Sequence, residues 1–133
     1  MREIQFRAWY PEKHKMYEVA KVDMWGDLEQ ATCDLAAIDE ELFDIYLHEV
    51  ETMQYTGLKD KNGKKIFEGD ILERGGFWGW YVAYEDGGFR KIPINTVQRI
   101  NWEHSLLEQD TMYYWEIIGN IHDNPELVEE EMK

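Results

Sequence analysis

The segment Met53-Gln-Tyr-Thr-Gly-Leu-Lys-Asp-Lys-Asn-Gly-Lys-Lys-Ile-Phe-Glu-Gly-Asp-Ile-Leu72 decides the fold class of this chain. Asn62-Gly63 lies between two runs of strand-favouring residues, and this pair readily takes the positive φ angles of a type I′ hairpin turn. Gly69, inside the second run, indicates a bulge or a close approach of the backbone rather than a flat strand. The segment therefore predicts a β-hairpin followed by a bent strand, which suits a small barrel.

Alternating apolar and polar residues predict more strands on both sides of this segment. At the N-terminus the alternation runs from Ile4 to Tyr10, stops at Pro11, and resumes at Tyr17 and Val19, which is typical of a hairpin. Towards the C-terminus, the residues from Trp80 to Tyr84 alternate between two Gly-rich turns. Further β-prone segments cover residues 89–94, 96–102 and 112–118, so most of the chain is expected to be β-structure.

The stretch from Asp23 to Glu51 gives a mixed signal. Apolar residues recur there at spacings of three and four, and Asp39 is a suitable N-cap, which predicts a short helix from Asp39 to Leu47. A strand through Phe43, Ile45 and Leu47 fits the same residues. Near the C-terminus, Asp123 is expected to cap a last helical turn that has Pro125 in its first turn.

These elements together predict a mainly β fold with a few short helical turns. Residues 53–133 are expected to form a small barrel-like unit, SH3-like or related. Residues 1–52 are expected to form an N-terminal β-hairpin and a variable segment packed on that unit. A chain of 133 residues with 44% hydrophobic and 14% aromatic residues has enough apolar surface to fold without disulfides or a metal.

Charge and targeting signals limit the possible partners and the location. The formal net charge of −14 repels a phosphate backbone at long range, so general nucleic-acid binding is disfavoured. Cys33 is the single cysteine, which excludes an intramolecular disulfide. The sequence has neither a signal-peptide h-region nor a run of apolar residues long enough to span a bilayer. We expect a cytoplasmic protein that does not bind membranes.

The residues with reactive side chains do not form a catalytic motif. Ser105, the only serine, is not in a nucleophile elbow, and no histidine can be assigned as a base for Cys33 by spacing. The possible ligands His104, His122 and Asp123 lack a metal-binding spacing. We therefore expect no enzymatic activity, no cofactor and no metal. Cys33 is expected to be a partly buried structural thiol.

Two carboxylates leave a hydrolase as an unlikely alternative. Glu68 and Asp70 flank Gly69, and in a regular strand both side chains would point to one face and could bind a cation. A structural role fits the Gly-Asp pair better, with Asp70 accepting hydrogen bonds from backbone amides at the bend and Glu68 solvated.

Two groups of residues are candidates for binding. Four lysines surround the Asn62-Gly63 turn and could contact an acidic partner or nucleic acid: Lys59, Lys61, Lys64 and Lys65. Phe77 and Trp78 lie beside Gly-rich turns, and if they are exposed they would suit a protein partner, a subunit interface or a stacked base. Trp80, by its alternation with Val82, is expected in the core.

Three blocks of the sequence resemble the YopX family of phage and prophage proteins. The blocks are Arg2–Trp9, Met53–Leu72, and Glu116–Leu127 with its Gly119-Asn120 turn and terminal Asn124-Pro125-Glu126. Between them the match fades over Asp23–Val50 and Gln98–Thr111, where we expect variable binding specificity. The resemblance implies a mostly β protein and no catalytic residues, because the shared positions are chiefly turn formers.

The residues and the resemblance together predict an accessory protein of a phage or prophage. We expect it to bind a host or phage protein through an aromatic surface, without enzymatic activity, and to self-associate as a possible homo-oligomer. A nucleic-acid-associated protein or an acidic DNA mimic is the alternative.

Overall fold

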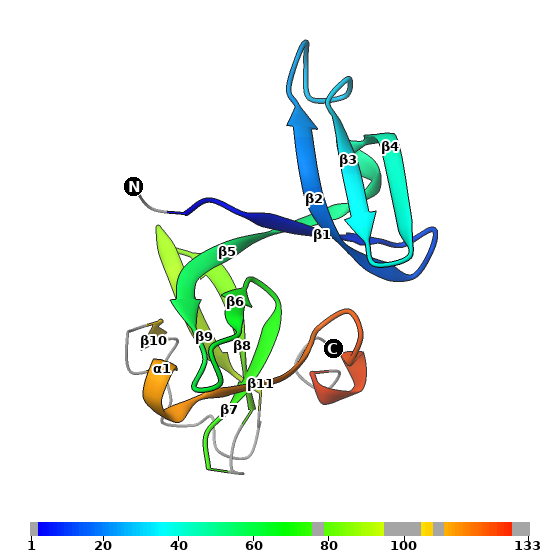
Figure 1. Ribbon diagram of the computed structural model, residues 1–133. Helices are drawn as coiled ribbons and strands as arrows, with labels where there is room; N and C mark the ends of the chain where they lie inside the picture. The colour runs from blue at the N-terminus through cyan, green and yellow to red at the C-terminus, as the bar shows by residue number, and fades with distance from the viewer. Residues whose placement is uncertain (1–2, 76–78, 95–104, 108–110, 129–133) are drawn as a thin grey trace. The chain divides into compact units, whose positions relative to one another are not determined.

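The computed structural model describes residues 3–75, 79–94, 105–107 and 111–128 (Figure 1). Its strands are β1 Phe6–Tyr10, β2 Lys15–Asp23, β3 Thr32–Ala37, β4 Glu40–Tyr46, β5 Glu51–Lys59, β6 Lys65–Phe67, β7 Asp70–Glu73, β8 Gly79–Glu85, β9 Gly88–Pro93, β10 Ser105–Leu106 and β11 Glu116–Asn120. The helical segments are η1 Leu47–Glu49, α1 Thr111–Tyr114 and η3 Pro125–Leu127. The prediction of a mainly β chain is confirmed. No helix among these residues is long and apolar enough to cross a membrane.

The strands pair into two antiparallel sheets, with the orders β4-β3-β2-β1-β5-β6 and β10-β9-β8-β7-β11. Among the described residues neither sheet closes on itself, because β10 pairs only with β9 and β11 only with β7 in the second sheet. The barrel-like prediction for residues 53–133 is therefore wrong in this respect, and an SH3-like arrangement is not confirmed. The chain divides into two compact units within β5, between Gln54 and Tyr55.

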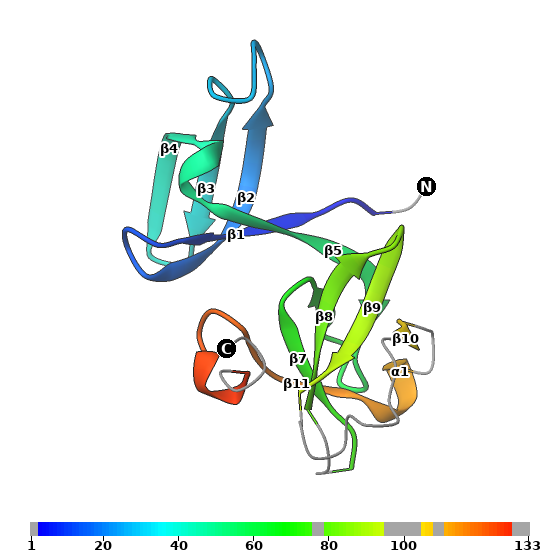
Figure 2. The same cartoon turned by 180° about the vertical axis from the view of Figure 1, so that it is seen from behind.

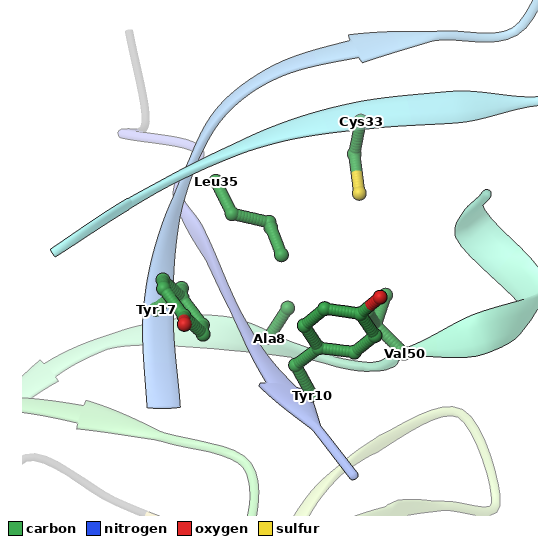
Figure 3. Packing of buried hydrophobic residues seen from close by; sticks show 6 residues of the cluster. All are labelled: Ala8, Tyr10, Tyr17, Cys33, Leu35 and Val50. Carbon is green, nitrogen blue, oxygen red and sulfur yellow. The ribbon is translucent and has the colours of Figure 1, made fainter. Parts of the chain in front are cut away.

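The N-terminal unit, from Glu3 to Gln54, has its core on one side of β1, β2 and β3. Six buried side chains, five from these strands and one from the residue just before β5, converge in Figure 3: Ala8, Tyr10, Tyr17, Cys33, Leu35 and Val50. The residues from β1 and β3 are two apart, as the alternation of a half-buried strand requires. The predicted N-terminal hairpin is confirmed as β1 and β2, paired from Arg7–Glu18 to Tyr10–Lys15.

The helix predicted from Asp39 to Leu47 is wrong: the segment is strand β4, followed by the short 3-10 helix η1. A bulge explains the misleading spacing. Asp44 has φ 56° and its N–H donates to Asp34 Oδ1 (3.0 Å), and the register shifts at this point. Leu42 and Ile45 consequently both pack on the core although they are three residues apart. The alternative strand is observed for Phe43 and Ile45, whereas Leu47, which it also included, begins η1.

The C-terminal unit is built around four buried side chains: Ile66, Leu72, Val82 and Trp115. The bend predicted at Gly69 is confirmed, since Gly69 has φ 85° and separates β6 from β7. Its N–H donates to the carbonyl oxygen of Val82 (2.7 Å) and its own carbonyl accepts from Ile121 (2.9 Å). The bend is therefore hydrogen-bonded to β8 and to the end of β11.

The turn between β5 and β6 is not type I′. Gly63 has φ 81°, but Asn62 does not have a positive φ, and the Gly63 N–H donates to the Asp60 carbonyl (3.0 Å). This is the longer hairpin loop in which a left-handed glycine follows a tight turn. A pair with both φ angles positive does occur between β8 and β9, at Asp86 (52°) and Gly87 (80°).

Two C-terminal expectations are corrected and others lie outside the described residues. The β-prone segment 112–118 begins with the helical turn α1, and only its later part belongs to β11. The last helical turn is η3, with Pro125 at its start, but Asn124 occupies the cap position in place of Asp123. The predicted strand 96–102 lies entirely outside the described residues.

Candidate binding surface

Large apolar side chains are exposed on the loop that joins β2 and β3. Trp25 is 86% exposed, Leu28 68% and Met24 58%, and every residue from 21 to 30 is exposed. We call residues 24–28 the Trp25 loop. It lies at the end of the β2–β3 hairpin opposite the β1–β2 turn, as Figures 1 and 2 show. Three adjacent apolar side chains at the tip of a hairpin are more than the scattered exposed apolar residues of an ordinary surface.

Polar contacts give the Trp25 loop its shape. The Trp25 N–H donates to Asp23 Oδ1 (3.0 Å), and the Gln30 N–H donates to the Asp27 carbonyl (3.0 Å). Gly26 has φ 86°, and a Cβ at this position would lie 2.1 Å from Gln30 Oε1. The loop is therefore folded by hydrogen bonds and a left-handed glycine, while its apolar side chains remain outside the core.

The base of the Trp25 loop is anchored to the N-terminal unit. Ala31, the residue before β3, is fully buried, and its carbonyl accepts the N–H of Leu47 (2.9 Å) at the start of η1. Cys33, two residues further along, belongs to the core. The loop thus projects from a fixed base.

The four predicted lysines lie on the β5–β6 hairpin, and the structure brings them together around one turn. Lys59 faces Lys65 in register on the neighbouring strand, which places two like charges opposite each other. Lys61 Nζ lies 3.7 Å from Glu116 Oε2, and Lys65 Nζ lies 5.3 Å from the ring centroid of Tyr55. The four lysines therefore lie close together, but Lys61 and Lys65 already contact other side chains of the chain.

Asp60 holds this hairpin to β11. Its side chain is only 2% exposed, and Oδ1 accepts the N–H groups of Asn62 (2.9 Å) and Lys64 (2.9 Å) while Oδ2 accepts that of Ile117 (3.0 Å). The Lys61 N–H also donates to the carbonyl of Trp115 (2.9 Å). Sequence reasoning did not identify Asp60, although an Asp two residues before Asn-Gly is a signal for such a turn.

Phe77 and Trp78 lie outside the described residues, so their predicted exposure stays a prediction.

Among the described residues, two tryptophan rings lie beside a buried lysine. Lys91 is 8% exposed, and its Nζ lies 4.4 Å from the ring centroid of Trp115 and 6.0 Å from that of Trp80. The two indoles meet edge to face at 5.8 Å. Trp80 packs against the core as predicted, and the sequence did not indicate that Lys91 is buried beside it.

The carboxylates considered for hydrolysis are placed as turn residues. Asp70 is 2% exposed, and its Oδ2 accepts the Phe67 N–H (2.8 Å), which is the structural role expected for it. Glu68 is half-buried. Within the part of the chain that the structure describes, no three His, Cys, Asp or Glu side chains are grouped as a metal site would require.

Cys33 has the environment of a structural thiol. It is 2% exposed, and burial, together with the nearby charge of Asp34, raises the pKa of the thiol. A raised pKa leaves less thiolate and lowers reactivity at neutral pH. Of the histidines in the chain, His14 packs against Trp9 with ring centroids 4.9 Å apart, and His48 stacks on Tyr46 with ring centroids 5.3 Å apart. His104 lies outside the described residues.

The end of β11 forms a turn in which side chains cap the backbone. Asn120 Oδ1 accepts the N–H groups of His122 (3.0 Å) and Asp123 (2.8 Å), and Asn124 Oδ1 accepts that of Asn120 (3.2 Å). The side chains considered as metal ligands, His122 and Asp123, follow this turn. The backbone N–H groups of these two residues donate the hydrogen bonds that close the turn.

A family model described as YopX protein matches residues 5–129, which is nearly the whole chain. The chain belongs to the YopX family. Among solved structures, this YopX-family chain is similar to the crystal structure of protein EF1440 from Enterococcus faecalis, with 27% sequence identity and a TM-score of 0.62. That similarity covers 96% of this chain and 99% of the other. A comparison with curated proteins finds no match.

These comparisons support the family and the fold, and neither name states a reaction, a ligand or a partner. Sequence reasoning singled out no residue of the Trp25 loop, although the loop lies in the Asp23–Val50 segment where it expected variable binding specificity. Met24 and Leu28 are four residues apart and Trp25 and Leu28 three apart, a spacing that also fits a helix, so only the turn residues Asp23, Gly26 and Asp27 could have indicated an exposed loop.

Proposed function

We propose that this YopX-family chain is a non-enzymatic protein-binding module that acts as an accessory protein of a phage or prophage. The exposure of Trp25, together with Met24 and Leu28, carries the proposal. Tryptophan is enriched among the residues that dominate binding energy, and truncating such a residue at the centre of an interface typically costs about 2 kcal/mol or more. An exposed Trp held by a folded loop is therefore well suited to anchor a protein partner.

Affinity capture with matched variants tests this function. The wild type, Trp25→Ala and Tyr113→Ala are used as baits in a lysate of the cells that encode the chain, with and without nuclease. Tyr113 is 73% exposed but lies on α1 of the other unit, so its variant controls for the general adhesiveness of an aromatic side chain.

We expect a protein that is retained by the wild type and Tyr113→Ala, is lost with Trp25→Ala, and is indifferent to nuclease. If no protein depends on Trp25, the proposal fails in this form. Dependence on Phe77 and Trp78, tested in a parallel double alanine variant, would move the binding surface to the residues that the sequence predicted.

The lysine-bearing hairpin favours a second candidate, association with an anionic partner such as nucleic acid. The observation behind it is the like-charge pair Lys59–Lys65, whose repulsion a bound phosphate would relieve. The test is binding of single-stranded DNA over a range of salt concentrations, with Lys59→Glu and Lys64→Glu as variants. An affinity for DNA that does not depend on salt, or that is unchanged in these variants, would exclude association with nucleic acid. The alternative of an acidic DNA mimic makes a different prediction, which is competition with DNA for a host protein.

A further inference from the structure

We infer that the Trp25 loop inserts into an apolar pocket of a partner protein whose rim carries basic side chains. The inference rests on the proposed function and specifies the chemistry of the partner. It follows from the shape of the loop, its exposed apolar side chains and the charges beside them.

The loop presents a convex apolar tip to solvent. Met24, Trp25 and Leu28 are all more than half exposed, and Gly26 with the Asp23 and Gln30 contacts holds the turn between them. A convex group fits a concave surface, and small apolar pockets are the usual acceptors for a single aromatic anchor. Because the loop is already folded, less conformational entropy is lost on binding than for a disordered segment.

Acidic side chains flank the apolar tip. Asp23, Asp27 and Glu29 are exposed, and Lys21 is the one basic residue between positions 21 and 30. No ion pair among the described contacts neutralises Asp27 or Glu29. A partner that seats Trp25 must bring its pocket rim close to these carboxylates, so basic rim residues are favoured and acidic ones are repelled.

The same charges disfavour the other possible occupants. A second copy of the chain would bring its own acidic loop and a formal net charge of −14 to the contact. Membrane-surface segments carry Lys and Arg beside their apolar residues, whereas this loop carries carboxylates, which anionic lipids repel. Nucleic acid is disfavoured for the same reason. A basic-rimmed protein pocket is the occupant that matches both the apolar and the charged parts.

The test uses the purified protein captured in a Trp25-dependent manner and measures its binding to four forms of the full chain. These are the wild type, Trp25→Ala, the charge reversal Asp27→Lys/Glu29→Lys, and the matched reversal Glu18→Lys/Glu41→Lys. Glu18 and Glu41 are exposed and both lie opposite Ala36 in the sheet, so the control changes the total charge equally but on the β2–β4 surface. Circular dichroism checks that each variant is folded.

We expect Trp25→Ala to weaken binding at least 10-fold, mainly through faster dissociation. The Asp27→Lys/Glu29→Lys variant should slow association about 10-fold in low salt, and the difference should shrink in high salt, while the Glu18→Lys/Glu41→Lys control changes much less. Equal effects of the two charge reversals, or none, would overturn the basic rim and leave the proposed function standing.

Three other outcomes would overturn the inference. The absence of any Trp25-dependent protein in the capture would remove the proposed function together with it. Sedimentation that shows a dimer for the wild type and a monomer for Trp25→Ala would assign the loop to a second copy. Trp25-dependent binding to phosphatidylcholine vesicles, without or with phosphatidylglycerol, would assign it to a membrane surface.

Discussion

Replacing Asp60 tests whether one buried carboxylate holds the lysine-bearing hairpin to β11. In Asp60→Ala, three backbone N–H groups lose their acceptor. A hydrogen bond to a charged group contributes about 1.5–3 kcal/mol, but the donors of Asn62 and Lys64 are at the exposed tip and can turn to water. The Ile117 N–H is half-buried and cannot turn to water as easily, so most of the free energy of its hydrogen bond is lost. We expect the free energy of unfolding to fall by about 3–5 kcal/mol.

The assay is urea denaturation followed by tryptophan fluorescence. A loss of this size is a large part of the stability of an ordinary domain, so Asp60→Asn provides a milder test in a variant that retains more of its stability. The amide keeps one acceptor oxygen for the tip but turns an NH₂ group towards the Ile117 N–H, which we expect to cost about 2 kcal/mol.

Asp123→Ala is the control for this experiment. Asp123 is exposed and its carboxylate accepts a hydrogen bond from the Asn120 side chain, so the change should be within about 0.5 kcal/mol. If both Asp60 variants unfold at the same urea concentration as the control, the three contacts do not stabilise the unit and the reasoning is refuted.

Two further predictions concern the β11 turn and the charges of the N-terminal unit. Gly119→Ala would place a Cβ 2.3 Å from Asn124 Oδ1, so we expect a loss of about 1–3 kcal/mol in urea denaturation, and equal stability of this variant and wild type would contradict this. Gly119→Ala/Asn124→Ala should recover only part of the loss, because it also removes the oxygen that accepts the Asn120 N–H. Hydrogen bonds donated by Lys13 and Tyr17 lower the pKa of Glu40 from 4.5 to about 2, so the stabilisation is complete above pH 4.5 and is lost as the pH falls towards 2. Between pH 4.5 and 2 the free energy of unfolding of Glu40→Gln should therefore change less with pH than that of the wild type. Identical pH profiles of the two proteins would exclude a contribution from the Glu40 carboxylate.

The strands that the sequence predicted correctly are those whose alternation is uninterrupted. Ala8 and Tyr10 on β1, and Val82 on β8, are buried as expected, although Trp9, which the alternation places on the opposite face of β1, is buried as well. The segment around Asp44 failed because a bulge inserts residues between Leu42 and Ile45, and the resulting spacing is typical of a helix. Local sequence does not record which strand lies next to β4, and the Asp34–Asp44 contact that sets the bulge exists only after β3 and β4 have paired.

The candidate site was predictable only in part. The lysines flank a turn that Asn62-Gly63 signals directly, so their clustering could be predicted, although not the Lys59–Lys65 register. Trp25 could not be separated from core tryptophans such as Trp80 and Trp115 by residue type, because burial depends on the packing of distant strands. Exposure is a tertiary property, and the turn residues around Trp25 were the one local signal.

The distribution of structural and exposed residues gives the binding proposal a physical basis. Turn formers such as Gly69 and Asn120 use their backbone and side-chain groups in hydrogen bonds within the chain. Trp25 contributes little to the core, so substitutions of its side chain should change stability by only about 0.5 kcal/mol. The loop also lies in Asp23–Val50, one of the two segments in which the sequence analysis expects variable binding specificity. A surface that can change without unfolding the chain is where a binding module can acquire different partners while its fold stays the same.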